Sequence, residues 1–411
     1  MPVNELPRLG IFQNNSTVSI FDLVEAASGL CRIVWIIGWA PDSPPARVLS
    51  RFGDVADVTG MTDSEIAKHL ATFNLSGLAV FNDPPLMVAA GVAEALNLRF
   101  HSPSTAEVLS DKFLQRRALR DASVAVPGFA AVRRSSPDAD VPFPAVLKPR
   151  AGAGARDTFL VRSARDVVDA LNRCDPDEEF ILEEWLPDRA TTQTLSANVV
   201  SVESITRDGN VDHLMVTGRF PYAPPFRDSG GFLPSDLEQS DWNDVCALAG
   251  RAILAAGIRD GVIHTEIKMT PSGPRVVEIN GRLGGGVSKL IERIGGPSLN
   301  GWVMRLALGD DVGPLPTFDQ SLVSFFHFVV APLNAVAFEA ISGLDELTAL
   351  KAQLGIDDIH VNVQPGQGVS TQQTSFTAYV VRIDGVVSSH QELAATLSAI
   401  DDTLTVTWAY S

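Results

Sequence analysis

The 411-residue sequence predicts a multidomain protein that combines the α/β and α+β fold classes. Because a typical domain has about 150 residues, the length predicts roughly two to four domains. Hydrophobic residues make up 45% of the chain and charged residues 20%, which is typical of a globular protein. Short apolar runs alternate with helical segments near the start, whereas paired strand patterns dominate the middle.

Residues 1–108 are predicted to form an α/β domain of the Rossmann-like kind. Apolar strand patterns occupy residues 9–12, 32–37 and 77–81, and an alanine-rich helix follows the last of them, up to Leu98. Uninterrupted apolar strands separated by helices are typical of a buried parallel sheet. Asp83 stands before a proline, a pattern that predicts the N-cap of this helix.

Residues 109–190 are expected to contain a helix at 109–122 and a strand at 145–149, followed by a glycine-rich turn. Glycines let backbone N–H groups approach a phosphate closely. The turn is not a Walker A motif, and on its own it does not separate a phosphate site from an ordinary flexible turn. The candidates here are two lysines and two glycines: Lys112, Lys148, Gly152 and Gly154.

The strongest local pattern is a β-hairpin within residues 261–280. If Met269 pairs with Arg275 across the turn, two carboxylates face each other, because Glu266 then lies opposite Glu278. The same register places His264 opposite Asn280 on that face, and Ile263, Ile267, Val277 and Ile279 on a core face.

Two carboxylates about 5 Å apart on one strand face repel each other. A divalent cation reverses this effect, and an oxygen-only set of Glu266, Glu278 and Asn280 suits Mg²⁺ that shares its ligands with phosphates. The alternative is a solvated strand face balanced by lysines such as Lys268. The hairpin alone leaves both interpretations open.

A glycine run follows the hairpin and precedes a short helix that begins near Val287. Backbone N–H groups at the start of a helix favour a bound anion. Arg282 adds a planar, permanently charged group for a carboxylate or phosphate. We expect Arg282, Gly284 and Gly285 to contact such a substrate group.

The rest of the chain is predicted to hold further strands and helices. Residues 191–313 are expected to form a core of strands with a helix at 241–256, and a loop at 219–234 is expected to border a substrate pocket. Residues 314–411 are expected to form a small α+β module with helices at 344–354 and 391–400.

Composition narrows the class of partner. With 49 acidic and 32 basic residues the formal net charge is −17, which disfavours nucleic acid as a partner. No apolar run is long enough to span a bilayer, no signal peptide is visible, and three scattered cysteines predict neither a disulfide framework nor a cysteine zinc site. We therefore expect a cytoplasmic protein without a membrane partner.

The order of these motifs resembles that of the ATP-grasp carboxylate–amine ligases. The lead-in segment at 90–112 and the tail segments at 341–347 and 365–366 are similar to the L-amino acid ligase branch, which forms dipeptides. The resemblance covers nearly the whole chain, and five loose motifs in the family's order make it specific. The motifs are Asp111–Phe113, Ala145–Pro149 with its glycine loop, Glu183–Leu186, His264–Glu266 and Glu278–Arg282.

The resemblance implies an ATP-grasp fold of two α+β subdomains after a pre-ATP-grasp domain, and it implies a role for each matching residue. Lys112 and Lys148 would neutralise phosphates of ATP. Arg282 would act in catalysis on the phosphoryl group and the acyl phosphate. The adenine would lie against Glu183, Glu184 and Leu186, mostly through backbone groups, and Glu266, Glu278 and Asn280 would hold Mg²⁺, for which Mn²⁺ can substitute.

Two departures from the family's pattern concern the nucleotide. Where many relatives have a glutamate for the ribose, this chain has residues 187–191, in which Asp188 is the substitute. Arg156 stands where the glycine loop usually has small polar residues; it either reaches the γ-phosphate or is solvated.

The implied reaction is formation of an amide and ADP from a carboxylate, an amine and ATP, through an acyl phosphate. The substrates are an amino acid or another carboxylate and an amine, most simply a second amino acid, and a homodimer is a family-level expectation. The alternatives are a carboxylase or purine-pathway ligase of the same superfamily, and a nucleotide-binding regulatory protein without turnover.

Overall fold

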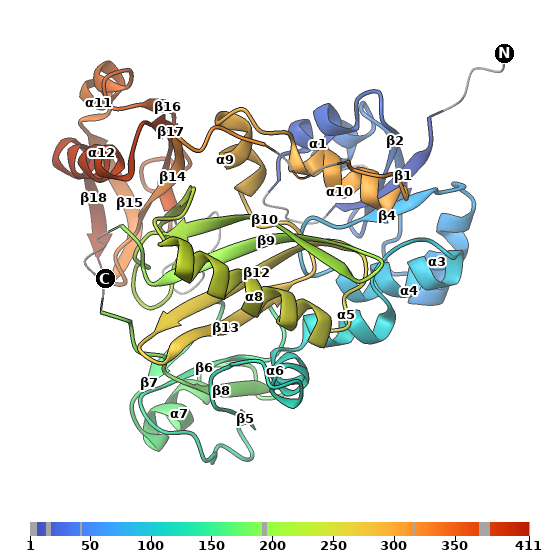
Figure 1. Cartoon of the computed structure of the whole chain (residues 1–411), viewed down its shortest axis with the longest axis horizontal. Helices are drawn as coiled ribbons and strands as arrows, with labels where there is room; N and C mark the ends of the chain where they lie inside the picture. Colours follow the sequence, from blue (N-terminus) through green and yellow to red (C-terminus); the bar gives the residue numbers. More distant parts are fainter. Residues whose placement is uncertain are drawn as a thin grey trace.

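The computed structural model describes residues 6–13, 18–41, 43–190, 195–313, 315, 317–369 and 379–410. Within this part of the chain the strands form a parallel four-stranded sheet, an antiparallel four-stranded sheet, a central eight-stranded sheet and a two-stranded sheet. In Figure 1 the central sheet occupies the middle, with the N-terminal domain on one side and the C-terminal region on the other. No helix among the described residues is long and apolar enough to cross a membrane.

The N-terminal region forms the expected parallel sheet, with strand order β3-β2-β1-β4. Its strands are β1 (Arg8–Gln13), β2 (Arg32–Ile37), β3 (Asp54–Asp57) and β4 (Gly77–Ala79), and its helices are α1 (Ile20–Ala27), α2 (Pro44–Leu49), α3 (Asp63–Ala71) and α4 (Leu86–Leu96). Strand β3 was not predicted, because two of its four residues are aspartates, which are uncommon in strands. The expected N-cap at Asp83 is wrong, because α4 begins at Leu86 with Pro85 before it.

The single helix predicted at 109–122 is two helices, α5 (Pro103–Ser110) and α6 (Lys112–Asp121). They meet at Asp111, whose backbone is extended (φ −121°, ψ 110°). The Asp111 carboxylate accepts hydrogen bonds from the backbone N–H groups of Phe113 and Leu114. An aspartate competes with the helix in this way, so it ends one helix and caps the next.

The second sheet forms a small subdomain with strand order β5-β8-β6-β7. Its elements are β5 (Phe129–Val132), β6 (Ala145–Pro149), β7 (Phe159–Val161), α7 (Ala164–Leu171) and β8 (Phe180–Glu184). The amphipathic helix α7 buries Val167, Ala170 and Leu171 against this sheet. In Figure 1 the subdomain lies beside the edge of the central sheet formed by β12 and β13.

The central sheet has strand order β13-β12-β9-β10-β11-β14-β17-β16. The strands from the predicted core are β9 (Val199–Arg207), β10 (Asn210–Arg219), β11 (Gly230–Leu233), β12 (Gly261–Thr270) and β13 (Gly273–Asn280). The 17-residue helix α8 (Gln239–Ala255) packs on one face of these strands (Figure 1). Helices α9 (Val287–Arg293) and α10 (Leu299–Ala307) pack on the other face, where the candidate site lies.

The C-terminal region extends this sheet across the predicted boundary at residue 314. Strand β14 (Val323–Val330) pairs with β11, followed by β17 (Tyr379–Val387) and β16 (Ile356–Val361). Strands β15 (Ala335–Ser342) and β18 (Thr405–Tyr410) form the two-stranded sheet, and the helices are α11 (Leu344–Leu350) and α12 (His390–Thr403). The region thus has the predicted α+β character but shares its sheet with the core.

Candidate active site

The β12–β13 hairpin brings the two predicted carboxylates opposite each other. Glu266 pairs with Glu278 and His264 with Asn280, as expected. The expected pairing of Met269 with Arg275 is wrong: Met269 faces Pro274, and a β-bulge between Glu266 and Ile267 absorbs the difference. The bulge places one extra residue, Val277, on β13.

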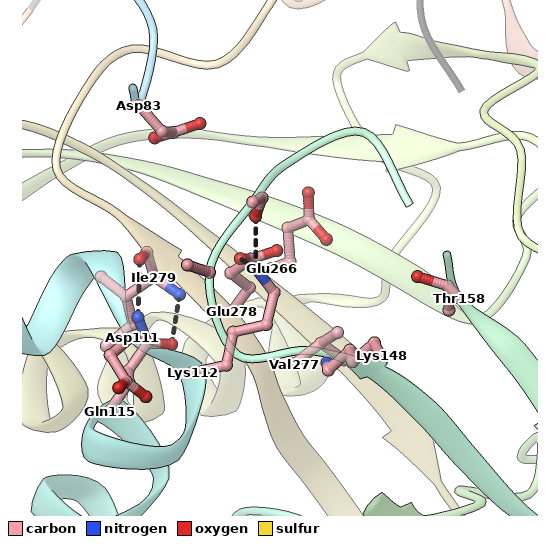
Figure 2. Close-up of polar contacts among 12 residues, drawn as sticks. Asp83, Asp111, Lys112, Gln115, Lys148, Thr158, Glu266, Val277, Glu278 and Ile279 are labelled. Atoms are coloured by element: carbon pink, nitrogen blue, oxygen red, sulfur yellow. Dashed lines mark hydrogen bonds and ion pairs between the residues drawn. The ribbon is translucent and has the colours of Figure 1, made fainter. Parts of the chain in front are cut away.

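The bulge also changes the core face of β13. Val276 and Ile279 are fully buried in the core under α8, whereas Val277, which was expected there, is only half-buried. The backbone carbonyl of Val277 instead accepts a hydrogen bond from Arg116 on α6. Gln115 binds the backbone of Ile279 through both its amide oxygen and its amide nitrogen, at 2.9 Å each (Figure 2). Helix α6 is therefore fixed against this strand.

Lys112 is the cation beside Glu278. Its Nζ lies 3.0 Å from Glu278 Oε1 and donates to the carbonyl of Gly152 at 2.5 Å. Figure 2 shows Lys112 next to this carboxylate, with Glu266 on the neighbouring strand. Lys268, which the alternative interpretation used as the balancing charge, pairs with Asp188 and with the carbonyl of Ala197. The cation that balances Glu278 is therefore the predicted phosphate-binding lysine.

His264 links Glu266 to a third carboxylate. Its Nδ1 hydrogen-bonds Glu203 of β9, and its Nε2 lies 3.3 Å from Glu266 Oε1. Burial opposes protonation of this imidazole, but Glu203 and Glu266 outweigh it and raise its pKa to about 9. Glu203 is fully buried, and its Oε2 also accepts the backbone N–H of Gly284 at 3.3 Å.

The donor set of the hairpin fits Mg²⁺. Among the described residues no three His, Cys, Asp or Glu side chains gather closely enough to enclose a metal. Two opposed carboxylates and the nearly buried amide of Asn280 provide oxygens alone, and they leave positions for other ligands. Mg²⁺ is usually held by one or two carboxylates together with substrate phosphates.

Lys148 and Glu183 form a buried ion-pair cluster with Arg116. Lys148 Nζ lies 2.7 Å from Glu183 Oε2, and Arg116 Nε lies 2.8 Å from Glu183 Oε1. Burial lowers the pKa of Lys148. Burial raises the pKa of Glu183, but the two cations outweigh it, so the net shift is downward. The side chain of Glu183 thus fixes Lys148, and its backbone pairs with β5 and β6, so a contact of Glu183 with the adenine stays a prediction.

The segment predicted to contact the adenine, which we call the hinge, comprises the end of β8 and the residues up to Leu186. Glu184 accepts the backbone N–H of Gly128 at 3.0 Å and donates its own N–H to the carbonyl of Gly128 at 2.8 Å. Leu186 is half-buried in the extended segment that follows. Asp188, the predicted ribose residue, pairs with Lys268, and Thr191 lies outside the described residues.

The glycine loop between β6 and β7 is held by local ion pairs. Gly152 and Gly154 have φ values of +126° and +68°, a region that favours glycine. Arg156 pairs with Asp157 at 2.7 Å and with Glu178. This ligand-free arrangement directs Arg156 to its own subdomain, so a contact with the γ-phosphate stays a prediction.

Arg282 is anchored by the N-terminal domain. Its Nη2 lies 2.6 Å from Asp83 Oδ2, and its Nε lies 3.1 and 3.2 Å from the two oxygens of the same carboxylate. Nearby, buried His101 contacts the carbonyl of Gly281 through Nε2 at 3.0 Å. A carboxylate from another domain therefore orients the arginine that was expected to bind phosphate.

The glycine run is packed tightly. A Cβ on Gly284 would come within 2.9 Å of Glu203 Oε1 and 2.8 Å of a methyl group of Val287, so only glycine fits. Gly285 is half-buried in the turn before α9. Because α9 has only seven residues and Gly284 already donates to Glu203, anion binding by these glycines stays a prediction.

Four residues of this region were missed in the sequence analysis: Asp83, Arg116, Glu203 and Arg219. Each acts through a partner far away in the chain; for example, Asp83 and Arg282 are 199 residues apart. The one available signal was the strand pattern of β9, in which a glutamate occupies a position that the sheet buries.

Comparison with known protein families shows that residues 109–286 match the ATP-grasp domain family. The uncharacterized protein y4rH of Sinorhizobium fredii is 24% identical over 304 residues, which are 72% of this chain and 60% of that protein. Carnosine synthase 1 of Gallus gallus is 32% identical over 177 residues, 41% of this chain and 19% of that enzyme. The chain thus matches about three fifths of the first relative's length and under a fifth of the second's.

Three solved structures share the fold across almost the entire chain. The L-amino acid ligase of Bacillus licheniformis has a TM-score of 0.78 at 19% identity and covers 99% of this chain and 100% of its own. The N5-carboxyaminoimidazole ribonucleotide synthetase of Thermotoga maritima has a TM-score of 0.70 at 17% identity, with 98% and 100% covered. The biotin carboxylase domain of the Hydrogenobacter thermophilus 2-oxoglutarate carboxylase, a dimer with MgADP and bicarbonate, has a TM-score of 0.67 at 14% identity, with 98% and 92% covered.

Proposed function

Because residues 109–286 form an ATP-grasp domain inside a chain that shares its whole fold with an L-amino acid ligase, we propose that this protein is an ATP-dependent, ADP-forming carboxylate–amine ligase. It phosphorylates the carboxylate of an amino acid and couples the resulting acyl group to an amine. The amine is most simply a second amino acid, so the product is a dipeptide or a related amide.

One observation carries this proposal: the opposed pair Glu266 and Glu278 lies among three cations that suit a nucleotide. Lys112 contacts Glu278, Lys148 lies at the end of β6, and Arg282 follows the hairpin directly. Phosphoryl transfer depends on positioning and charge neutralisation more than on covalent chemistry by the protein. Carboxylates for Mg²⁺ and cations for phosphates supply these two needs.

Each residue has a role in this proposal. Lys112 and Lys148 neutralise phosphates, and the hinge backbone at Glu183, Glu184 and Leu186 contacts the adenine. Glu266, Glu278 and Asn280 would hold Mg²⁺, which supplies Lewis-acid stabilisation of phosphoryl charge when bound. Arg282, oriented by Asp83, stabilises the phosphoryl group as it moves to the substrate carboxylate and the acyl phosphate that results.

A second candidate function is that of a carboxylase or purine-pathway ligase. The structural likeness to an N5-carboxyaminoimidazole ribonucleotide synthetase favours it, at a lower TM-score than that of the L-amino acid ligase. A regulatory protein without turnover is disfavoured by the assembled set of carboxylates, lysines and arginine.

The test is Mg²⁺-dependent ADP release measured across pairs of the common amino acids, with mass spectrometry of the products. The proposal predicts ADP release that requires both partners of a pair and a product whose mass is their sum minus water. ADP release that depends on bicarbonate instead supports the second candidate. ATP binding without turnover under all of these conditions contradicts both.

A further inference from the structure

Arg219, at the end of β10, is a buried cation beside the carboxylate pair that the proposed reaction leaves without a role. Its side chain is 10% exposed. The sheet register aligns Glu266 with Ser201 of β9 and Ser201 with Thr217 of β10, and Arg219 stands two residues after Thr217. Because side chains alternate along a strand, Arg219 lies on the same face as Glu266.

The guanidinium contacts three groups. Its Nε donates to Ser201 Oγ at 3.3 Å, its Nη1 lies 3.0 Å from Asp228 Oδ2, and its Nη2 lies 3.4 Å from His264 Nε2. Burial opposes its charge, but Asp228, Tyr222 and the glutamates of the site outweigh burial and raise its pKa, so the group stays charged. An arginine has five N–H donors, and the described residues accept at most three hydrogen bonds from it.

The contact with His264 leaves Nη2 poorly satisfied. The same imidazole Nε2 lies 3.3 Å from Glu266, and one ring nitrogen carries either a hydrogen or a lone pair. At 3.4 Å from a ring nitrogen that also contacts Glu266, Arg219 Nη2 has a weak partner. The donors of Nη2 are then available to an anionic group at the site, next to the carboxylates that are expected to hold Mg²⁺.

The opposite edge of the guanidinium is anchored. Asp228 accepts from Nη1 and also accepts the backbone N–H of Gly230 at 3.0 Å through its other oxygen. This arrangement fixes the loop at 219–234, which the sequence predicts to border the substrate pocket. The arginine is therefore held through Nε and Nη1, and its Nη2 is left to bind a ligand.

We propose that Arg219 binds the carboxylate of the amine substrate, so that the acceptor is an amino acid and the product keeps a free carboxylate. This inference rests on the proposed function. The carboxylate of the first substrate is consumed, whereas that of the acceptor persists throughout the reaction and needs its own cation. An arginine suits a carboxylate because it is permanently charged and its N–H groups make strong, charge-assisted hydrogen bonds.

The coupling step balances without any other reactant. The acceptor nitrogen forms a C–N bond with the acyl carbon, and the C–O bond to phosphate breaks, with its electron pair leaving on inorganic phosphate. The nitrogen, which attacks as the neutral amine, gives up one proton to the departing phosphate. Arg219 exchanges no proton in this step; it holds the acceptor in place.

Hydroxylamine separates acceptor binding from acyl phosphate formation, because it captures acyl groups and has no carboxylate. In Arg219→Met, the KM for an amino acid acceptor is expected to rise about 10- to 100-fold, the range for losing a charge-assisted hydrogen bond. The KM for ATP and the hydroxamate rate are expected to stay within about twofold. Arg219→Lys keeps the charge, so its KM for the amino acid acceptor is expected to lie between those of wild type and Arg219→Met.

Arg227 provides the matched control, because it is a buried arginine of the same loop that donates to the carbonyls of Pro224 (2.8 Å) and Ala331 (2.6 Å). Arg227→Met is expected to leave the ratio of peptide to hydroxamate rates unchanged. An independent measurement uses the wild-type protein alone. Replacing the acceptor amino acid by its carboxamide is expected to raise the acceptor KM in the same way as the Arg219→Met substitution.

Equal losses of the peptide and hydroxamate reactions in Arg219→Met would overturn the inference, since Arg219 would then only balance the charges of Glu203 and Glu266. An unchanged acceptor KM, or equal use of acceptor and carboxamide by wild type, also overturns it. Wild type that releases no ADP with either nucleophile refutes the proposed function itself, an outcome distinct from the other two.

Discussion

Glu278 lies next to Lys112 of α6, whereas Glu266 lies next to His264 of its own strand. Each carboxylate thus has a cationic or hydrogen-bonding partner of its own in the ligand-free chain. This explains how two acids tolerate direct opposition on neighbouring strands, which otherwise destabilises a sheet. Because their partners differ, Glu266 and Glu278 are expected to respond differently to substitution.

Replacing Glu278 by alanine is expected to abolish ADP release, with a loss above ~100-fold, because one carboxylate for the metal disappears. The fold is expected to persist, since Glu278 is a half-buried acid that lies opposite another acid. Steady-state ADP release and thermal unfolding measure the two effects. Glu179→Ala, an exposed acid that pairs with Arg150, is the control; wild-type turnover in Glu278→Ala would remove the metal assignment.

Asp83→Asn is expected to lower kcat about 10- to 100-fold with little change in the KM for ATP. Arg282 remains at the site, but it loses the charged carboxylate that orients it. Initial rates over a range of ATP concentrations check this. Asp83→Glu keeps the charge and is expected to restore part of kcat. A variant that changes only the KM for ATP would show that Asp83 does not act through Arg282.

At the scale of single elements, α6 and the small subdomain are joined by a buried charge cluster. Arg116 on α6 reaches Glu183 on β8, which reaches Lys148 on β6, and Arg116 also binds the backbone of β13. The cluster ties four elements together with buried charges that solvent does not screen. Removal of one member leaves an uncompensated buried charge.

Arg116→Met is expected to lower the free energy of unfolding by about 3–5 kcal/mol, since Glu183 loses one of its two cations. Urea denaturation measures this. Arg120→Met, at an exposed position of the same helix, is expected to change it by less than about 0.5 kcal/mol. Equal effects of both substitutions would contradict a structural role of the cluster.

Acidification tests the same cluster. The pKa of Glu183 is lowered in the folded protein, because its two cations outweigh burial. Its contribution to stability is therefore present above the unfolded pKa of about 4.3 and is lost as the pH falls through the lower folded value. The free energy of unfolding of wild type is expected to fall in acid as this contribution is lost, and that of Arg116→Met is expected to fall by less.

Sequence patterns predicted elements where a local signal exists. The parallel sheet, α8, and the pairing of Glu266 with Glu278 follow from apolar runs and alternation along the chain. The bulge at Val277 has no local signal in the sequence, and the break at Asp111 was missed because helical periodicity continues through it. The Asp83–Arg282 pair has no local signal, since tertiary packing alone brings these residues together.

At the scale of the whole molecule, the central sheet runs through two of the predicted domains, residues 191–313 and 314–411. Strands β11 and β14 pair across the predicted boundary, and one core joins Leu233 and Phe326 to the residues of α9 and α10. The C-terminal region therefore completes the sheet that carries the site. Its removal would expose an edge strand and part of a core.

A chain truncated after residue 313 is expected to be insoluble or to lose cooperative unfolding, because β11 loses its partner β14 and Phe232 loses its cover. Solubility after expression and dye binding to exposed apolar surface measure this. A soluble truncated chain with wild-type ADP release would show that the C-terminal region folds independently of the site.

The position of Lys112 has a consequence for how the protein loads its nucleotide. A single ammonium group occupies the space beside Glu278 and at the same time holds the carbonyl of Gly152 in the loop above it. In the proposed function, loading is an exchange: Mg²⁺ would take the place of the ammonium group beside Glu278, and Lys112 would release the carbonyl of Gly152. A divalent ion that arrives by itself must compete with this internal counterion, whereas one that arrives with a triphosphate offers the displaced lysine a new partner.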